Sequence, residues 1–459
     1  MNQRTTPSQG RRAIVLGASI AGLLAARVLQ EYFEEVCLLE RDTLANGAQM
    51  RKGTPQALHA HGLLARGRES IETLFPGFTD ALAARGAQLG DLHANGPFVA
   101  GGRRFAVAAC GRTALACSRL AIEAELRLRV RALPRVHVIE QADIVQPVLD
   151  GASVAGVRFM HRDGGSDETL AADFVVDCTG RGSRMPSWLA AWGFEAPEQQ
   201  RVKVGIGYAT ACLRREAQHA PGIAALIFAA TPELPRPGVL LAQEPLDGGP
   251  PRWIVTLAGY AGDHPEPTIE GMRQRARSMG DAALVRILDE GELLGPIATF
   301  TFPHSQRRRF ERLKRFPEGL LVMGDAHASF NPVYGQGMSV AACEALALRA
   351  ALACGREGAH RRFFAAAARI VDTPWQTAVG GDLALAGVPG ERSRAVRFVN
   401  GYLAHVFRAA PTDRKVALAF IKVAHLIASP PSLFAPQVVA RVLWSGARSR
   451  SRAQCSRSV

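Results

Sequence analysis

A glycine-rich turn near the N-terminus has the spacing of a phosphate-binding loop. The segment Gly17–Gly22, which reads GASIAG, follows the apolar run Ala13–Leu16 and leads into a helical pattern. Gly17 permits a tight turn and Gly22 permits close helix–strand packing, so backbone N–H groups and a helix N-terminus can face a pyrophosphate. Ser19 stands where a further glycine is usual. It is small enough for phosphates to approach the backbone, and it can cap the helix.

An acidic residue lies where the ribose of a dinucleotide is held. Glu40 ends a second apolar run, Glu35–Glu40, about 20 residues after the turn, where a carboxylate can bind ribose hydroxyls. Strand, turn, helix and strand form a βαβ unit with a parallel strand pair. A carboxylate favours an unphosphorylated ribose, so this unit predicts binding of FAD or NAD. The alternative interpretation is a βαβ unit whose glycine turn holds no ligand.

A second segment, Gly324–Ser339, reads GDAHASFNPVYGQGMS and also joins a strand to a helix. Asp325 at the strand end suits a ribityl hydroxyl. The helix beginning at Gly337–Met338 presents its N-terminus, which suits the negative charge that develops at the N1–O2 edge of a reduced flavin. Alone, the same pattern also fits a glycine-rich turn with an Asp cap. A third segment, Asp173–Arg184 (DFVVDCTGRGSR), reads by its spacing as a plain strand-to-loop turn.

The order of these three segments resembles the single-component flavin monooxygenases of the para-hydroxybenzoate hydroxylase fold, over Ala13–Cys354. In that family GxGxxG binds the ADP half of FAD, GD binds the ribityl chain, and a middle DG serves FAD and nicotinamide binding. Four stretches are most similar to polyether-antibiotic epoxidases of the lasalocid and monensin type and related tailoring enzymes. They read MRKGTPQALHAHGLL, CSRL, VVDCTGRGS and GDAHASFNPVYGQGMS.

The resemblance implies a set of FAD-binding residues. The AMP half would be held by Gly17, Ser19, Ile20, Ala21, Gly22, Glu40 and Arg41. Arg51 would approach the pyrophosphate or the isoalloxazine edge, and Arg119 the phosphate–ribityl region. Gly324 and Asp325 would bind the ribityl chain and the diphosphate, and the flavin ring would be bordered by Pro332, Gly335, Gly337 and Met338. For Arg51 and Arg119 the alternative is a solvated surface arginine.

The chain departs from the family pattern in the middle motif. Thr179–Gly180 stands where the family has Asp-Gly, so the carboxylate is missing at that position. Direct handling of a nicotinamide cofactor is therefore in doubt. Electrons are expected from NADPH or NADH, either directly or through a separate flavin reductase.

The implied activity is that of an FAD-dependent monooxygenase. It would insert one oxygen atom from O2, through a flavin C4a-hydroperoxide, into an apolar organic substrate, by epoxidising an alkene or by hydroxylation, in natural-product tailoring. Such flavin-centred chemistry needs no side-chain nucleophile. Candidates for residues that line the flavin are Pro332, Tyr334, His59 and His327. The alternatives are an FAD-dependent reductase or dehydrogenase of the geranylgeranyl-reductase type, and a non-catalytic flavin-binding module.

The elements that must position these residues predict an α/β fold with a discontinuous Rossmann-like FAD-binding domain of the para-hydroxybenzoate hydroxylase type. We expect that domain at residues 11–75, 106–195 and 305–364. Short β-type runs predict an interleaved antiparallel-sheet substrate domain at residues 76–105 and 196–304, with one helical stretch, Thr268–Leu288. A helical region at 365–445 and a disordered basic tail at 446–459 complete the chain. A helix is also expected at Ala60–Leu74.

Aromatic residues of the predicted sheet are the candidates for substrate contact, with an ordinary core role as the alternative. They are Tyr208, Phe228, Trp253, Phe300 and Phe302.

Composition bounds the remaining possibilities. The chain has 459 residues, 47% hydrophobic and 21% charged, and a formal net charge of +14. The excess arginines are scattered without a basic–aromatic stripe, which speaks against nucleic-acid binding. The eight cysteines show no CxxC or Cys/His ligand spacing, so no metal site is expected. No run is apolar enough to span a bilayer and no secretory signal is evident, which predicts a cytoplasmic protein. The oligomeric state is left open.

Overall fold

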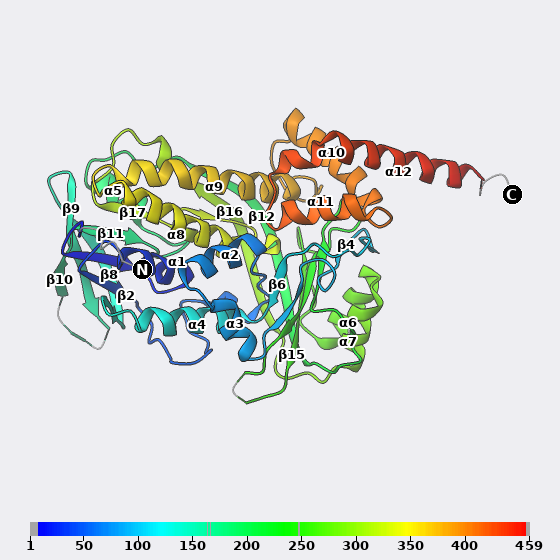
Figure 1. Ribbon diagram of the computed structural model, residues 1–459, viewed down its shortest axis with the longest axis horizontal. Coiled ribbons are helices and arrows are strands. Elements are labelled where there is room, and N and C mark those ends of the chain that lie inside the picture. The colour runs from blue at the N-terminus through cyan, green and yellow to red at the C-terminus, as the bar shows by residue number, and fades with distance from the viewer. Residues whose placement is uncertain (1–7, 163, 166, 247, 456–459) are drawn as a thin grey trace, which may run out of the picture.

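A computed structural model describes residues 8–162, 164–165, 167–246 and 248–455. Its first layer is a parallel five-stranded sheet in the order β17-β11-β1-β2-β7 (Figure 1). Apart from the edge strand β7, which is partly exposed, these strands are short apolar runs buried on both faces, as expected of a parallel sheet covered on each side. They come from segments far apart in the chain: β1 (Arg12–Leu16), β2 (Glu35–Leu39), β7 (Val136–Ile139), β11 (Phe174–Asp177) and β17 (Leu320–Val322).

Helices and a small antiparallel sheet sandwich this layer. Helices α1 (Ile20–Leu29) and α8 (Gly337–Ala353) pack on each other, with α4 (Arg119–Arg131) against α1 and α9 (Ala359–Asp382) against α8. A three-stranded sheet, β10-β9-β8, shares the same core through Val157 and Phe159. Its strands are β8 (Ala142–Asp150), β9 (Ser153–His161) and β10 (Asp167–Ala171). The predicted mixed α/β fold with a parallel dinucleotide-type sheet is confirmed.

An eight-stranded sheet forms the second layer, in the order β18-β16-β12-β15-β14-β13-β4-β5. The long strands β12 and β16 run antiparallel, and β18 joins the end of β16, so the segment after Gly324 ties the two sheets together. The strands are β4 (Phe98–Ala100), β5 (Arg103–Arg104), β12 (Gln199–Arg214), β13 (Ala225–Ala229), β14 (Gly238–Gln243), β15 (Arg252–Gly259), β16 (Ala298–Arg308) and β18 (Ala328–Ser329).

Two helices, rather than the predicted single one, cover the outer face of this sheet. Helices α6 (Ile269–Met279) and α7 (Ala282–Glu290) are separated at Gly280, whose φ of +76° ends α6. The Asp281 carboxylate then caps α7 by accepting from the backbone of Ala283 and Leu284.

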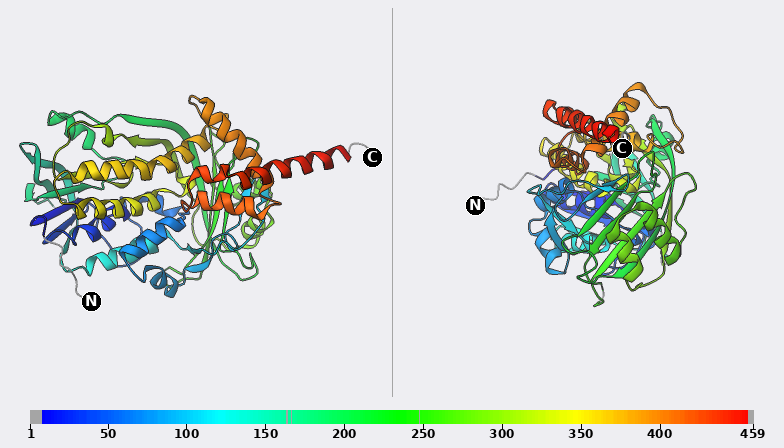
Figure 2. Two further views of the ribbon diagram at one scale, coloured as in Figure 1. Left: turned by 45° about the horizontal axis from the view of Figure 1, so that its top comes forward. Right: turned by 90° about the vertical axis from the view of Figure 1, so that its right-hand side faces the viewer.

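The remaining helices gather beside the open edge of the second sheet (Figure 1). Helices α10 (Arg394–Ala409), α11 (Arg414–Ala424) and α12 (Pro436–Cys455) share a small core with Ala100 and Phe105 of the β4–β5 hairpin. The far end of α12 projects from the body (Figure 2). Residues 446–455 are therefore helical where the sequence predicts a disordered tail, and residues 456–459 lie outside the described part. Among the described helices, none is long and apolar enough to cross a membrane.

The predicted helix at Ala60–Leu74 is wrong at its start. The chain forms a 3-10 turn at Pro55–Leu58, then runs extended, and α2 begins only at Ala65 and ends at Leu74. Tertiary bonds explain the difference: His59 Nδ1 lies 2.8 Å from Thr210 Oγ1, and Ala60 N donates to Thr256 Oγ1 at 2.9 Å. The other elements are α3 (Phe78–Ala84), β3 (Gln88–Asp91), β6 (Thr113–Ala116), α5 (Met185–Ala191) and 3-10 turns at Phe310–Arg312, Gly324–Ala326, Pro332–Tyr334 and Pro430–Phe434.

Candidate functional site

The turn Gly17–Gly22 is built as its glycines predict. Gly17 has a φ of +94° and donates from its backbone N to Leu39 O at 2.8 Å. A Cβ atom on Gly17 would lie 2.8 Å from Cys178 O, and one on Gly22 would lie 1.8 Å from Gly17 O. Both positions therefore exclude a side chain, which keeps the backbone of the turn close to β11 and α1.

The N-terminus of α1 is open to an anion. Ser19 occupies the N-cap position but makes no side-chain cap, contrary to the expectation from its residue type, and the first turn contains no acidic residue. Its hydroxyl is turned toward α4, where it accepts from Arg119 at 3.0 Å. The N–H groups and the positive end of the helix dipole are thus left for a ligand.

Glu40 and Arg51 lie beside this turn. Glu40 Oε2 accepts from Ala18 N at 2.8 Å and lies 3.2 Å from Arg51. The Arg51 guanidinium also pairs with Glu123 at 2.9 Å and Asp42 at 3.3 Å, and its side chain is only 8% exposed. Burial alone would lower the pKa of Arg51, but these carboxylates raise it. A solvated surface arginine is therefore excluded for position 51, whereas the Arg41 side chain is 57% exposed.

The Gly-Asp turn joins α1 to α8. Gly324 has a φ of +69°, and a Cβ atom on it would lie 2.7 Å from the Ala21 side chain in the first turn of α1. Its backbone N donates to Glu344 of α8 at 2.7 Å. His327 Nδ1 lies 2.7 Å from the other oxygen of Glu344, and both side chains are fully buried, with His327 between Phe310 and Phe364. His327 thus lies behind the turn, buried against Glu344, and its proposed contact with the flavin stays a prediction.

The side chain of Asp325 is accessible to solvent. Desolvation by the surrounding protein raises its pKa, and the positive charges of Arg119 and Arg181 oppose this shift. Its Oδ1 lies 3.7 Å from the Cβ position of Gly337, the first residue of α8. The α8 N-terminus, like that of α1, has neither a side-chain cap nor an acidic residue in its first turn. Two open helix N-termini and an accessible carboxylate therefore lie near one another, because Gly324 contacts Ala21 of α1 and Asp325 lies beside Gly337 of α8, an arrangement that suits an anionic ligand.

The middle segment supplies a carboxylate, but not a free one. Asp177, the last residue of β11, accepts from Thr179 N at 2.9 Å, Thr179 Oγ1 at 2.6 Å and Ser183 Oγ at 2.5 Å. It shapes the turn that follows and leaves Thr179 in the family's Asp position. Arg181, which the sequence analysis did not single out, donates to His304 O at 2.6 Å and lies over the Phe302 ring at 4.6 Å. Its charge also acts on Asp325, so it belongs to the candidate FAD site.

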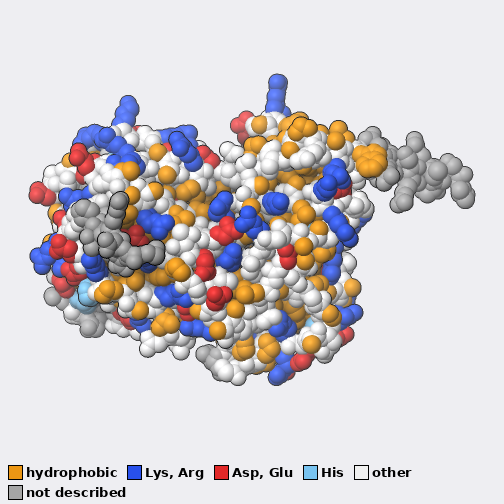
Figure 3. Space-filling model, in the orientation of Figure 1, with side chains coloured by type: hydrophobic (Ala, Val, Ile, Leu, Met, Phe, Trp, Pro, Cys, Tyr) orange, Lys and Arg blue, Asp and Glu red, His pale blue; other side chains and the backbone are white. Residues whose placement is uncertain are grey.

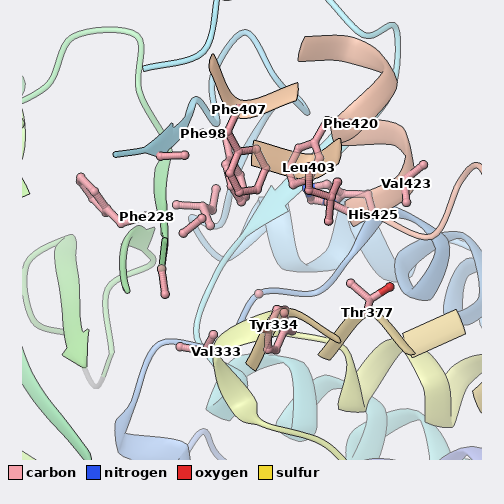
Figure 4. Close-up of a pocket in the computed structure, with 18 of the residues that line it drawn as sticks. Phe98, Phe228, Val333, Tyr334, Thr377, Leu403, Phe407, Phe420, Val423 and His425 are labelled. Atoms are coloured by element: carbon pink, nitrogen blue, oxygen red, sulfur yellow. The ribbon is translucent and has the colours of Figure 1, made fainter. Parts of the chain in front are cut away.

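A large cavity opens on the other side of the loop that follows Asp325. Its volume is about 1280 Å³ and its lining side chains are mostly apolar. In Figure 4 Val333 and Tyr334 form one wall, and Phe98, Leu403, Phe407 and Phe420 gather on the opposite one. Helices α10 and α11 thus cover the cavity, and the second sheet and the loop Pro332–Gln336 form its other walls.

Strand register separates the five predicted substrate aromatics. Phe228 is among the residues that line the cavity, although its pairing opposite Gly238 places it on the sheet face that carries Trp253. Tyr208 and Phe302 pack toward the end of α9, with Phe300 against them. Trp253 points to the opposite face of the sheet, into the core beneath α6 and α7. Side chains one residue apart on a strand face opposite ways, so register decides which aromatic can reach a ligand.

His59 lies between the second sheet and the cavity wall. It is 5.5 Å from the Phe300 ring and 6.1 Å from that of Tyr208, measured between ring centroids. Burial lowers the pKa of His59 to about 4 and that of His61 to about 3, so both are neutral at pH 7. The next residue, Ala60, lines the cavity, while His59 itself fixes the approach of this segment through Thr210.

The fold and this site define a flavoprotein with a dinucleotide-type sheet and a separate apolar cavity. The chain matches the family described as FAD binding domain over residues 11–365, and it belongs to that family, with FAD as its cofactor. No group of side chains among the described residues is arranged to hold a metal ion.

The chain is also similar to known proteins in sequence or in fold. The chain is 36% identical over 355 residues to protein Rv3254 of Mycobacterium tuberculosis (strain ATCC 25618 / H37Rv), covering 74% of this chain and 72% of that protein. Its fold is similar to that of a flavoprotein/dehydrogenase from Cytophaga hutchinsonii (TM-score 0.63, 16% identity, 90% and 92% of the two chains). It is also similar to p-nitrophenol 4-monooxygenase PnpA from Pseudomonas putida DLL-E4 (TM-score 0.61, 16% identity, 91% and 99%).

Proposed function

We propose that this protein is an FAD-dependent monooxygenase that oxidises a large apolar organic molecule, by epoxidation of an alkene or by hydroxylation, in natural-product tailoring. The observation that carries the proposal is the mostly apolar cavity of about 1280 Å³ against the loop Pro332–Gln336. This loop follows the Gly-Asp turn, so a flavin held by Asp325 and the two helix N-termini would meet the cavity at Pro332 and Tyr334. Mostly apolar walls suit a substrate without charge.

The chain's own residues bind and orient. The backbone of Gly17–Gly22 and the α1 N-terminus would hold the pyrophosphate, with Arg119 and Arg51 as the nearby cations. Asp325 would accept hydrogen bonds from ribityl hydroxyls, and the α8 N-terminus would stabilise negative charge at the ring edge. Bound FAD supplies the redox chemistry, taking two electrons from a reduced nicotinamide and using them to activate O2. One oxygen atom enters the substrate and the other leaves as water.

Electrons would come from NADPH or NADH, directly or through a separate flavin reductase. The middle segment favours the partner route, because Thr179 replaces the family's carboxylate and Asp177 is fully engaged within its own turn. Stopped-flow reduction of the purified holoenzyme by NADH or NADPH separates the two routes. Reduction within the time of one turnover means direct use, and reduction only after a flavin reductase is added means a partner.

An isotope experiment tests the proposed function. The holoenzyme is incubated with NADPH, NADH, a flavin reductase and a panel of apolar polyenes and polycyclic aromatics under ¹⁸O2. We expect a product that carries one ¹⁸O atom and is absent under argon. A product formed equally well without O2 would point to a reductase or dehydrogenase instead. Flavin that is bound and reducible, but whose reoxidation no compound of the panel accelerates, would contradict the proposal and favour a non-catalytic flavin-binding module.

A further inference from the structure

A buried polar cluster lies behind the loop that walls the cavity. Asp382, the last residue of α9, is fully buried, and a single oxygen of its carboxyl group accepts three hydrogen bonds. The donors are Asn331 Nδ2 at 2.8 Å, Tyr260 Oη at 3.1 Å and Tyr334 Oη at 3.2 Å. The other carboxyl oxygen is buried without a hydrogen-bond partner among the described residues.

The cluster connects three parts of the molecule. Asn331 and Tyr334 belong to the loop, Tyr260 follows β15 of the second sheet, and Asp382 ends the helix that leads into the roof of the cavity. Asn331 is itself fully buried, and its Oδ1 accepts from Tyr208 Oη of β12 at 3.1 Å and from Val333 N at 3.2 Å. The loop is therefore held on both sides by hydrogen bonds that pass through Asp382 or Asn331.

The loop packs closely against the end of α9. The Tyr334 side chain lies directly on Gly381, where a Cβ atom would be 2.3 Å from the hydroxyl oxygen. The other face of Tyr334 lines the cavity (Figure 4). Tyr334 both lines the cavity and donates to Asp382, so a change in the protonation of Asp382 acts on the cavity wall through Tyr334.

We propose that Asp382 is a positioning residue that, as a neutral acid, holds the loop Asn331–Gly335 in place beside the flavin, and that its ionisation loosens the loop. This inference rests on the proposed placement of the flavin against that loop, not on the oxygenation itself. The groups that face Asp382 are Tyr334 and Asn331 of the loop and Tyr260 of the sheet, with Tyr208 reached through Asn331.

The physical reason lies in the cost of charge in this cluster. Burial raises the pKa of Asp382 to about 7, against the lowering effect of the hydrogen bonds from Asn331, Tyr260 and Tyr334. When Asp382 is ionised, its unpartnered oxygen carries charge in an apolar surrounding, which is unfavourable. Above neutral pH the free energy of the cluster is therefore lowered when it opens toward water. The movable side of the cluster is the loop, since its single 3-10 turn has far fewer backbone hydrogen bonds than β15 and α9.

The test is the affinity of the apoprotein for FAD, measured by quenching of flavin fluorescence between about pH 5.5 and about pH 8.5. For the wild type we expect affinity to fall severalfold through a midpoint near neutral pH. Asp382→Asn keeps an acceptor oxygen of the same size but cannot ionise, and its affinity should be level across the range. Tyr334→Phe removes one of the two hydrogen bonds that the loop donates to Asp382 and should bind FAD more weakly at every pH.

A matched control is Tyr402→Phe, which removes a tyrosine hydroxyl on α10 that donates to Leu433 O at 2.7 Å, outside the cluster. It should follow the wild-type curve. A wild-type affinity that does not change with pH would overturn the inference, as would an Asp382→Asn curve that titrates like the wild type or a Tyr334→Phe protein of unchanged affinity. Because no turnover is measured, these outcomes do not depend on whether the protein oxygenates any substrate.

Discussion

Arg51 and Glu123 form an ion pair of 2.9 Å between the segment that follows β2 and helix α4, directly beside the turn Gly17–Gly22. Glu40 and Asp42 complete the acidic surround of the guanidinium. Glu123 also pairs with Arg119 at 3.6 Å and with Arg127 at 3.8 Å. Because Glu123 has these other partners, we expect an approaching pyrophosphate to compete with it for Arg51.

Replacement of Arg51 should weaken FAD binding. For Arg51→Gln we expect a loss of about tenfold to about a hundredfold, the value of one charge-assisted hydrogen bond. Isothermal titration of the apoprotein with FAD measures it, with a melting curve to check folding. Arg277→Gln is the matched control, because that side chain is 52% exposed on α6, far from the turn, and should change affinity less than twofold, within about 0.5 kcal/mol. Equal losses in the two variants would contradict the role given to Arg51.

A methyl group on Gly22 should disrupt the turn. In Gly22→Ala the new Cβ atom would lie 1.8 Å from Gly17 O, and backbone cannot give way as a flexible side chain would. We expect the free energy of unfolding to fall by about 1–3 kcal/mol, as in overpacked sites, with loss of FAD binding. Urea denaturation measures the first and flavin absorbance the second. Gly47→Ala, where a Cβ atom meets nothing within 4 Å, should unfold at the wild-type urea concentration.

The free energy of unfolding of the apoprotein should depend on pH through Asp382. Its pKa is about 7 in the folded protein against 3.8 ordinarily, so between these values the folded state binds the extra proton. The contribution to stability is complete below about pH 4 and is lost as pH rises toward 7, by up to about 1.4 kcal/mol per pH unit. Thermal unfolding of Asp382→Asn should lack this component, so the difference in Tm from the wild type should change steadily over the window. A constant difference would show that Asp382 does not titrate there.

The two phenylalanines of α10 offer a test of the cavity. Phe407 lines it, whereas Phe398 does not and is 68% exposed. Once a substrate is known, Phe407→Ala should raise its KM by about tenfold or more, in line with the loss of one aromatic contact, while FAD affinity stays unchanged. Phe398→Ala should leave both constants as in the wild type. A substrate whose KM responds to neither change binds elsewhere.

The positive charges are scattered over the structure, as the sequence predicts. On the face shown in Figure 3 the Lys and Arg side chains are interspersed with acidic ones instead of forming one patch. Many arginines are engaged in ion pairs, among them Arg307 with Asp372 and Arg104 with Asp281. The net charge of +14 is therefore consistent with scattered arginines that serve the fold.

The candidate FAD site was predictable because its signals are local. Gly17, Gly22 and Gly324 are demanded by backbone geometry within a few residues, and the apolar runs before them make buried parallel strands whatever surrounds them. Local patterns were misleading where hydrogen bonds to residues far away in the sequence determine the conformation. The segment after Leu58 has a helical pattern but is held extended by Thr210 and Thr256.

By itself, then, the sequence determined the dinucleotide-type fold, the family of the FAD-binding domain and the residues of its glycine turns, because these follow from short-range sterics and apolar periodicity. Only the tertiary structure decided which aromatics meet the cavity, how Arg51 is balanced by Glu123, and that Asp382 meets Asn331 and Tyr334. Asp382 lies 48 residues from Tyr334 and 122 from Tyr260 in the sequence, so no short-range pattern predicts the cluster. Strand register and helix packing bring these side chains together, and the burial they create gives the carboxyl group its altered chemistry.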